Sequence, residues 1–489
     1  MSGIYSLYKK MSHLTMVSTL AFFVSDRISG LWDENRRYVC KSIKKNVDYK
    51  QKNPSSIKDL KIAYVCDEMT YKSFSDLTDS VYLTPWNWYE ILEKEKPDIF
   101  FCESAWSGIG EYGDCWRGRI YKSDKVKYNN RKVLFNILEY CEANGIKTVF
   151  WNKEDPTFFG NTSYDFIDTA LHFNYIFTTA EECVERYKER GAKHVYVLPF
   201  GFSPKLFNPM DSCEKENRAV FAGSWYPEHK ERCKQMKAMF DEVLEKGIRL
   251  HIFDRNADVK ETVNVFPEEY QDYVHGKVPF EELGKEIKKS QYGININTVV
   301  NSSTMFARRV YEMMACNVCV ISNESQGIRN QFPERVWFVG EEFDTSKTKG
   351  ICRANVQEVL EKHTNESRLR NIFKEIYGIA ESEKICVAII TDAPKDDCEN
   401  EYVQVRYYKN LQDITDENYF ILEDECTFSP DEIYGMLVHY QYLDSNVAIR
   451  ISESDRYCFV EENKYKDALI SVKLMNSVIN NKLIQIYSV

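Results

Sequence analysis

The segment from Ser303 to Cys316 carries the residue types best suited to chemistry. It contains Arg308, Arg309 and Glu312, and its apolar positions follow the spacing of a helix. Two arginines near a helix start favour an anion such as a pyrophosphate, and Glu312, one turn further, could accept hydrogen bonds from two ribose hydroxyls. The alternative is a surface ion pair worth at most ~0.5 kcal/mol. Spacing alone favours neither interpretation.

A Gly-Ser pair, Gly223-Ser224, follows the apolar run at 219–222. Glycine lets a backbone approach a phosphate closely, and serine adds a hydroxyl donor. Because Gly-Ser is also a common turn, this pair predicts a phosphate contact only together with other signals.

Polar residues also follow the other short apolar runs of the chain. In open parallel sheets, ligands bind beyond the carboxyl ends of the strands. Loops are often polar, so one polar residue after a strand says little. The repetition of carboxylates and amides after the strands of both halves is more informative. The candidates of this kind are Glu68, Glu103, Glu154 and Asp155 in the first half and Arg255 in the second.

The elements that position these residues are short apolar runs alternating with helix-like segments from Lys61 onward. This alternation predicts βα units and parallel sheets. The loop 199–209 is rich in proline and glycine and separates a first series of runs from a second, so we expect two α/β domains facing a cleft. The expected strands are 61–66, 98–102, 147–151, 175–178 and 194–198, then 219–222, 249–253, 292–296 and 318–322, then 385–391, 419–422 and 447–451.

These series predict four regions along the chain. They are an N-terminal helical segment at 1–58, a Rossmann-like domain at 59–205, a second Rossmann-like domain with returning helices at 206–382, and an accessory α/β domain at 383–489.

Charge and cysteine usage exclude several classes of function. The 489 residues carry a net charge of −11, which argues against a broad nucleic-acid-binding surface. The 15 cysteines are scattered and lack zinc-site spacing. They predict reduced thiols in a reducing compartment, and hence a cytoplasmic protein.

No stretch of the sequence reaches the roughly 18–20 apolar residues that span a bilayer. The nearest run, 14–24, follows two lysines and lacks a cleavage pattern. We interpret it as an N-terminal helix, and the alternative is an interfacial helix in peripheral contact with a membrane.

Beyond these patterns, roughly residues 60–345 resemble the CgeB-type (spore-maturation protein) glycosyltransferases, whose second half is similar to the group 1 glycosyltransferases. The second-half motifs are VFAGSWYPE at 220–228, YGININT at 292–298 and SSTMFARRVYEMMAC ending at Cys316. The first-half motifs are DEMTYKSF at 67–74, KPDIFFCESAWSG at 96–108, FWNKEDPTFF at 150–159, FTTAEECVERY at 177–187 and LPFGFSP at 198–204.

The resemblance implies a GT-B fold and a hexosyltransferase-like activity. A nucleoside-diphosphate-sugar donor would be held by the second half, and a glycan, glycoprotein or cell-surface polysaccharide acceptor by the first. Glu312 matches the ribose-binding Glu, and Arg308 and Arg309 match the paired arginines before it. Gly223-Ser224 matches the phosphate-side loop, and Lys277-Val278 belongs to the loop that packs on the base.

Enzymes of the GT-B type usually need no metal or cofactor, so fixed cations and amides must stabilise the leaving diphosphate. We expect Arg308, Arg309 and the Gly223-Ser224 amides to do so, with Arg255 as a weaker addition. A base should come from the first domain, and the candidates in order are Glu154 and Asp155, then Glu103 and Glu68.

The sequence departs from the group 1 pattern at several positions. Thr304, predicted to contact the donor, stands where many group 1 enzymes carry a second Glu, so retaining or inverting stereochemistry stays open. Asn317 replaces a usual glycine. The region 383–489 resembles part of a GT-A domain, with Glu423-Asp424-Glu425 in place of Asp-x-Asp, and we expect it to serve structure or acceptor docking.

Other functions remain open at this point. One is a degenerate nucleotide-binding or scaffolding protein, suggested by Thr304 and the short C-terminal region. Another is a nucleotide-sugar epimerase on the same scaffold. A modifier of nucleic acid bases is disfavoured by the acidic charge. The sugar, the nucleotide, the acceptor and the oligomeric state do not follow from the sequence.

Overall fold

The computed structural model describes residues 54–125, 129–212, 214–259, 263–378, 384–423, 428–452, 457–460, 465–480 and 484–489. The expected N-terminal helical segment lies outside these residues up to position 53. The chain divides into two compact units. Unit 1 contains the described residues up to Phe200, Ser302–Met305 and residues 368–378. Unit 2 contains Gly201–Asn301, Phe306–Ser367 and the described residues from 384 onward.

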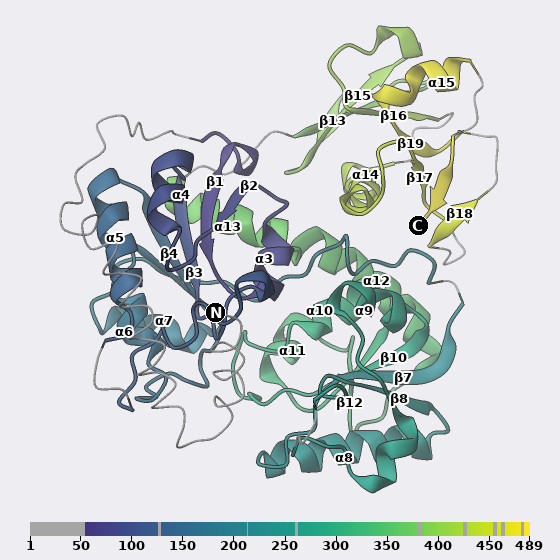
Figure 1. Ribbon diagram of the computed structural model, residues 1–489. Helices are drawn as coiled ribbons and strands as arrows, with labels where there is room; N and C mark the ends of the chain where they lie inside the picture. Colours follow the sequence, from purple (N-terminus) through teal and green to yellow (C-terminus); the bar gives the residue numbers. More distant parts are fainter. Residues whose placement is uncertain are drawn as a thin grey trace. The chain divides into compact units, whose positions relative to one another are not determined.

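Unit 1 is built on a six-stranded parallel sheet (Figure 1). Its order is β2-β1-β3-β4-β5-β6, so the winding direction reverses between β1 and β3. The five expected strands are confirmed; β2 was not predicted, because its sequence DSVY is polar and half-exposed at the sheet edge. The strands are β1 (Lys61–Val65), β2 (Asp79–Tyr82), β3 (Ile99–Glu103), β4 (Lys147–Asn152), β5 (Tyr175–Thr178) and β6 (Val195–Val197).

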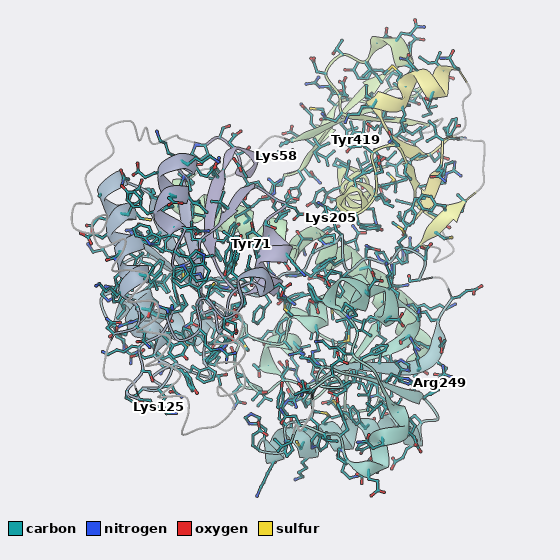
Figure 2. All side chains as sticks on the ribbon, viewed as in Figure 1. Lys58, Tyr71, Lys125, Lys205, Arg249 and Tyr419 are labelled. Atoms are coloured by element: carbon teal, nitrogen blue, oxygen red, sulfur yellow. The ribbon has the colours of Figure 1, made fainter. Side chains whose placement is uncertain are left out.

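Helices cover this sheet and complete its core. They are α3 (Glu68–Phe74), α4 (Trp88–Glu95), α5 (Lys132–Asn144), α6 (Phe166–Ala170), α7 (Val184–Lys188) and the late helix α13 (Asn365–Tyr377). Leu369, Ile372 and Phe373 of α13 are buried in the same core as β1 and β3, so this returning helix stabilises unit 1. Figure 2 labels Tyr71 of α3, whose ring centroid lies 5.9 Å from that of Tyr64.

Unit 2 contains a second six-stranded parallel sheet. Its order is β12-β11-β10-β7-β8-β9, which is the 3-2-1-4-5-6 order of the Rossmann fold when its strands are counted from β7. The reversal falls between β7 and β10, and all four expected strands are confirmed. The strands are β7 (Glu216–Gly223), β8 (Arg249–Asp254), β9 (Val274–His275), β10 (Ser290–Asn295), β11 (Cys319–Ser322) and β12 (Trp337–Phe338).

Helices pack on both faces of this sheet. They are α8 (Lys230–Glu245), α9 (Phe280–Lys288), α10 (Arg309–Ala315), α11 (Gln326–Gln331) and α12 (Thr348–Lys362). Met236 and Phe240 of α8 share a core with Tyr292 and Ile294. The intervening Gly293 points to the opposite face, where a Cβ atom would come within 2.3 Å of Met313 Sδ. Gly293 therefore allows α10 to lie directly on β10.

Helix α10 begins at Arg309, and Arg308 is its N-cap. The two arginines therefore lie at the helix start, as expected. The preceding residues 302–305 belong to unit 1, and their bonds hold them in an irregular conformation. Asn317, which ends the connection to β11, adopts a left-handed conformation with φ of 58°, as expected for the residue that replaces a glycine.

The C-terminal region of unit 2 forms an eight-stranded mixed sheet of order β14-β15-β13-β16-β19-β17-β20-β18. The three expected strands are confirmed as β13, β16 and β17. The elements are β13 (Ile385–Ile390), β14 (Cys398–Glu399), β15 (Val403–Tyr408), β16 (Tyr419–Leu422), β17 (Ala448–Arg450), β18 (Cys458–Val460), β19 (Ala468–Ser471), β20 (Ile486–Ser488), α14 (Pro430–Leu437) and α15 (Met475–Ile479). Asp424 and Glu425 of the predicted acidic segment lie outside the described residues.

The fold class is therefore α/β, with two Rossmann-like parallel sheets and an additional C-terminal α/β sheet, as expected. Within the described part of the chain, no helix combines the length and the apolar character needed to cross a membrane.

Candidate functional site

Each parallel sheet has one point where its winding direction reverses, and ligands bind beyond the strand ends at such points. In unit 2 this point is the carboxyl edge of β7 and β10; in unit 1 it is the carboxyl edge of β1 and β3. Most residues that the sequence nominated follow the strands at these two edges.

The Gly223-Ser224 turn ends β7 at the unit 2 edge. A Cβ atom on Gly223 would lie 2.7 Å from a ring carbon of Phe221 and 3.4 Å from Nη1 of Arg309, so the position has no room for a side chain. Ser224 is 2% exposed, and its Oγ has no hydrogen-bond partner among the described residues. The turn thus offers a close backbone approach and a buried hydroxyl that a ligand could bond.

Three arginines gather around this turn. Nη1 of Arg309 is buried and has no hydrogen-bond partner among the described residues. The backbone N–H of Arg255 donates to the Gly223 carbonyl at 3.0 Å, and Nη1 of Arg232 donates to the Ser224 carbonyl at 3.2 Å. Burial, with Arg255 and Arg232 adding to it, lowers the pKa of Arg309 to about 10.

These three guanidinium groups lack a compensating carboxylate: within the described part of the chain, no Asp or Glu oxygen is in ion-pair contact with them. Arg255 is exposed and Arg232 half-buried, but the buried Nη1 of Arg309 is a cationic group without a partner among the described residues, which is costly. The arrangement therefore suits an anion of more than one charge. The sequence reasoning missed Arg232, because it lies on α8, eight residues beyond Ser224, and nothing in its local sequence separates it from a solvated helix residue.

Arg308 and Arg309, predicted as a pair, have different partners. Nε of Arg308 lies 2.7 Å from Oε1 of Glu312, whose side chain is 6% exposed. The Arg308 guanidinium also lies 5.2 Å from the centre of the Phe280 ring. Successive residues of a helix point about 100° apart, so this pairing leaves Arg309 directed to the Gly223-Ser224 turn.

Three other residues predicted to contact the donor are not bonded to the Gly223-Ser224 turn among the described residues. Lys277 is exposed and Val278 half-buried in the connection between β9 and α9, and among the described residues neither is hydrogen-bonded to the turn. Thr304 belongs to unit 1, where its hydroxyl donates to the Thr179 carbonyl at 2.9 Å and accepts from the backbone N–H of Glu181 at 3.0 Å.

In unit 1, Glu103 connects three strand ends. Its carboxylate accepts the backbone N–H of Asp67 at 2.6 Å and lies 2.8 Å from Nζ of Lys153. Burial raises the pKa of Glu103. Burial alone would lower the pKa of Lys153, but Glu103 and Asp67 outweigh it and raise that pKa. Glu103 is 0% exposed, so it serves as a buried link between β1, β3 and β4.

Asp155 is also fully buried. Its two carboxylate oxygens accept hydrogen bonds from Asn152 at 2.9 Å, Thr178 at 2.7 Å and Tyr187 at 3.0 Å. Burial raises its pKa to about 7. This saturated environment favours a structural role. Glu68 is exposed at the start of α3 and forms an ion pair with Lys72 at 2.8 Å.

Glu154 is the half-buried member of the four predicted carboxylates. Its Oε1 accepts the indole N–H of Trp106 at 2.9 Å. Burial raises its pKa, and the bond from Trp106 and the charge of Lys153 oppose that change. A hydrogen-bonded carboxylate of this kind can accept a proton from a hydroxyl group. No role for Trp106 was predicted from the sequence, although Trp106 stands in the motif that contains Glu103.

No group of three or more His, Cys, Asp or Glu side chains suited to hold a metal ion occurs among the residues that the structure describes.

Residues 232–374, from α8 to α13, match the family described as "Glycosyl transferase-like". This segment contains Arg232, Arg255, Arg308, Arg309 and Glu312, so the arginine cluster and the buried ion pair lie in a glycosyltransferase-like region. No curated protein matches the chain.

Several solved structures show a distant likeness. The Anabaena protein Alr3699/HepE, in complex with UDP-glucose, is 12% identical, with 65% of this chain and 95% of that chain covered and a TM-score of 0.37. The protein TarM is 12% identical, with 60% and 58% covered and a TM-score of 0.39. An alpha-glucosyltransferase in complex with UDP and a 13-mer DNA is 10% identical, with 65% and 96% covered and a TM-score of 0.40. The strand orders of this chain, rather than these likenesses, define its fold.

Proposed function

We propose that this chain is a metal-independent, cytoplasmic glycosyltransferase of the CgeB type. It would move a sugar, as a hexosyltransferase does, from a nucleoside-diphosphate-sugar to a hydroxyl of a glycan, glycoprotein or cell-surface polysaccharide. The observation that carries the proposal is the cluster of Arg232, Arg255 and Arg309 around the Gly223-Ser224 turn, which is buried in part and forms no ion pair with a carboxylate of the described residues.

The diphosphate of the donor would occupy this cluster. Fixed cations and a buried hydroxyl there would stabilise the negative charge that grows on the diphosphate as the sugar leaves, without reorganising during the reaction. Glu312, held by Arg308, lies one helical turn from the arginine cluster and would accept hydrogen bonds from the ribose hydroxyls.

A nucleotide-binding protein without transferase activity is the second candidate. It is favoured by Thr304, which replaces a carboxylate expected near the reacting sugar and whose hydroxyl is already bonded to Thr179 and Glu181. This candidate predicts nucleotide binding without release of a nucleoside diphosphate.

The test is to incubate the metal-free protein with UDP-, GDP- and dTDP-sugars and to measure released nucleoside diphosphate and the identity of the sugar. Glu312→Ala is the test variant. Glu216→Ala is the matched control, because Glu216 is an exposed carboxylate that pairs with Arg249 at the far end of the same sheet.

Release from one donor, lost in Glu312→Ala and kept in Glu216→Ala, is the expected result. A sugar converted without release would instead indicate an epimerase. Nucleotide binding without release of a nucleoside diphosphate would favour the second candidate. If the protein neither bound a nucleotide nor released a diphosphate, both candidate functions would be contradicted.

A further inference from the structure

Four motifs of unit 1 form one network at the carboxyl edge of its sheet. The backbone N–H of Trp106 donates to Asp67 at 2.9 Å, and the backbone N–H of Lys153 donates to the Ser104 hydroxyl at 2.9 Å. The hydroxyl groups of Thr178 and Tyr187 bond Asp155. This network holds Trp106 and Glu154 on adjacent strand ends.

The indole ring of Trp106 is fixed on several sides. Its centroid lies between 5.2 and 5.7 Å from those of four aromatic rings, with T-shaped or tilted geometry. Contacts of this type favour one orientation of the ring. The four are Tyr121, Phe158, Tyr164 and Phe166. The indole N–H therefore points in a defined direction, towards the Glu154 carboxylate.

The backbone of Glu154 is fixed as well. Its N–H donates to Oδ1 of Asn152 at 3.1 Å, and the preceding Lys153 pairs with Glu103. Because backbone and side chain are both held, the carboxylate has one preferred position. The half-buried state of Glu154 leaves part of the residue open to solvent, unlike Glu103 and Asp155.

The charged groups that face Glu154 act in opposite directions. Lys153 favours its ionised form, whereas Glu103 and Asp67 disfavour it. The nearby Asp155 is a further carboxyl group, bonded to Thr178 and Tyr187. The hydrogen bond from Trp106 is the largest of the influences that oppose the rise in the pKa of Glu154 caused by burial.

We propose that Trp106 is a positioning residue that holds Glu154 as the carboxylate that contacts the acceptor hydroxyl. This inference rests on the proposed transferase function. The hydroxyl oxygen would bond the anomeric carbon of the sugar, and the bond from that carbon to the diphosphate oxygen would break with its electron pair. The hydroxyl proton would pass to Glu154.

The first test follows the indole N–H signals of protein labelled with ¹⁵N-tryptophan during a pH titration. The chain has eight tryptophans, and Trp106→Phe identifies the signal of interest by its loss. We expect that signal to shift as Glu154 titrates and the shift to vanish in Glu154→Gln. An unchanged titration in Glu154→Gln would overturn the coupling, whether or not the protein is active.

The second test compares the pH profile of nucleoside diphosphate release. In Trp106→Phe, which keeps a ring but removes the donor, the acid limb should move up by about half to one pH unit. Trp116→Phe is the matched control, because the indole N–H of Trp116 bonds the Leu83 carbonyl instead. Release by wild type with the same profile in both variants would overturn this inference alone, whereas no release by wild type would contradict the proposed function.

Discussion

The guanidinium of Arg308 and the carboxylate of Glu312 form an ion pair at 2.7 Å, four residues apart along the chain. Both side chains are largely buried, at 18% and 6% exposure. In the part of the chain that the structure describes, the neighbouring Arg309 has no such partner. A motif with two adjacent arginines therefore supplies two functions: Arg308 orients the carboxylate, and Arg309 offers a free charge to a ligand.

Removing Arg308 should expose the cost of an unpaired buried carboxylate. Arg308→Met is expected to lower the free energy of unfolding by about 2 kcal/mol, because Glu312 then lacks its cation. The double variant Arg308→Met/Glu312→Met should recover most of that loss. Urea unfolding of the four proteins in a double-mutant cycle measures the coupling; additive losses would contradict the pairing.

Removing the charge of Arg309 should have the opposite effect on stability. Because its buried Nη1 has no hydrogen-bond partner among the described residues, Arg309→Met should stabilise the ligand-free protein by about 1 kcal/mol. The matched control is Arg249→Met, since Arg249 is an exposed ion-paired residue on the same sheet (labelled in Figure 2) whose loss should change stability by less than about 0.5 kcal/mol. A lower melting temperature for Arg309→Met would show that the charge is compensated in the free protein.

Asp155 should make the stability of the folded protein depend on pH. Burial raises its pKa from 3.8 to about 7, so the folded state favours the protonated form. Its contribution to stability is present below about pH 4 and is lost as the pH rises through about 7. The melting temperature of wild type should fall more between pH 5 and pH 8 than that of Asp155→Asn.

A carboxylate with the opposite shift provides the control for that experiment. Hydrogen bonds from the hydroxyl groups of Thr162 and Ser163 lower the pKa of the exposed Asp124. The melting temperature of Asp124→Asn should therefore fall between pH 5 and pH 8 as much as that of wild type. An equal decrease in wild type and Asp155→Asn would mean that Asp155 is ionised in the folded protein across this range.

The strands and their grouping were predictable because buried parallel strands are short apolar runs, and each expected run became a strand. Among the missed strands, β2 and β9 lie at sheet edges, where the half-exposed Ser80 and the exposed His275 interrupt any apolar run. The prediction also missed β12, β14, β15, β18, β19 and β20. Local sequence also marked Gly223-Ser224, Arg309 and Glu312 as neighbours in a ligand site, and the structure brings Gly223 and Arg309 together.

Other features of the site depend on tertiary contacts that spacing cannot reveal. Arg232 joins the cluster because α8 packs on the sheet beside β7. Thr304 belongs to unit 1 because the chain leaves the second sheet there and bonds Thr179. Glu103 and Asp155 looked as accessible as Glu154 in the sequence, since burial is set by the packing of neighbouring strand ends.

Thr304 provides a separate prediction about that connection. Thr304→Val removes a hydroxyl that both donates to Thr179 and accepts from Glu181, and should cost about 1–2 kcal/mol of stability. Thr304→Ser keeps the hydroxyl and should retain most of the stability of wild type. If Thr304 is structural, the nucleotide affinity of both variants will equal that of wild type. A large loss of affinity in the folded Thr304→Val would instead support a contact with the donor.

Calorimetric titration of a nucleoside diphosphate and the matching monophosphate tests most directly whether the arginine cluster around Gly223-Ser224 binds a diphosphate. We expect wild type to bind the diphosphate of at least one nucleotide about tenfold or more tighter than the monophosphate. Arg309→Gln should abolish that preference, and Arg249→Gln should keep it. Equal affinity for the two ligands, or the same preference in Arg309→Gln as in wild type, would contradict a diphosphate site at the end of β7.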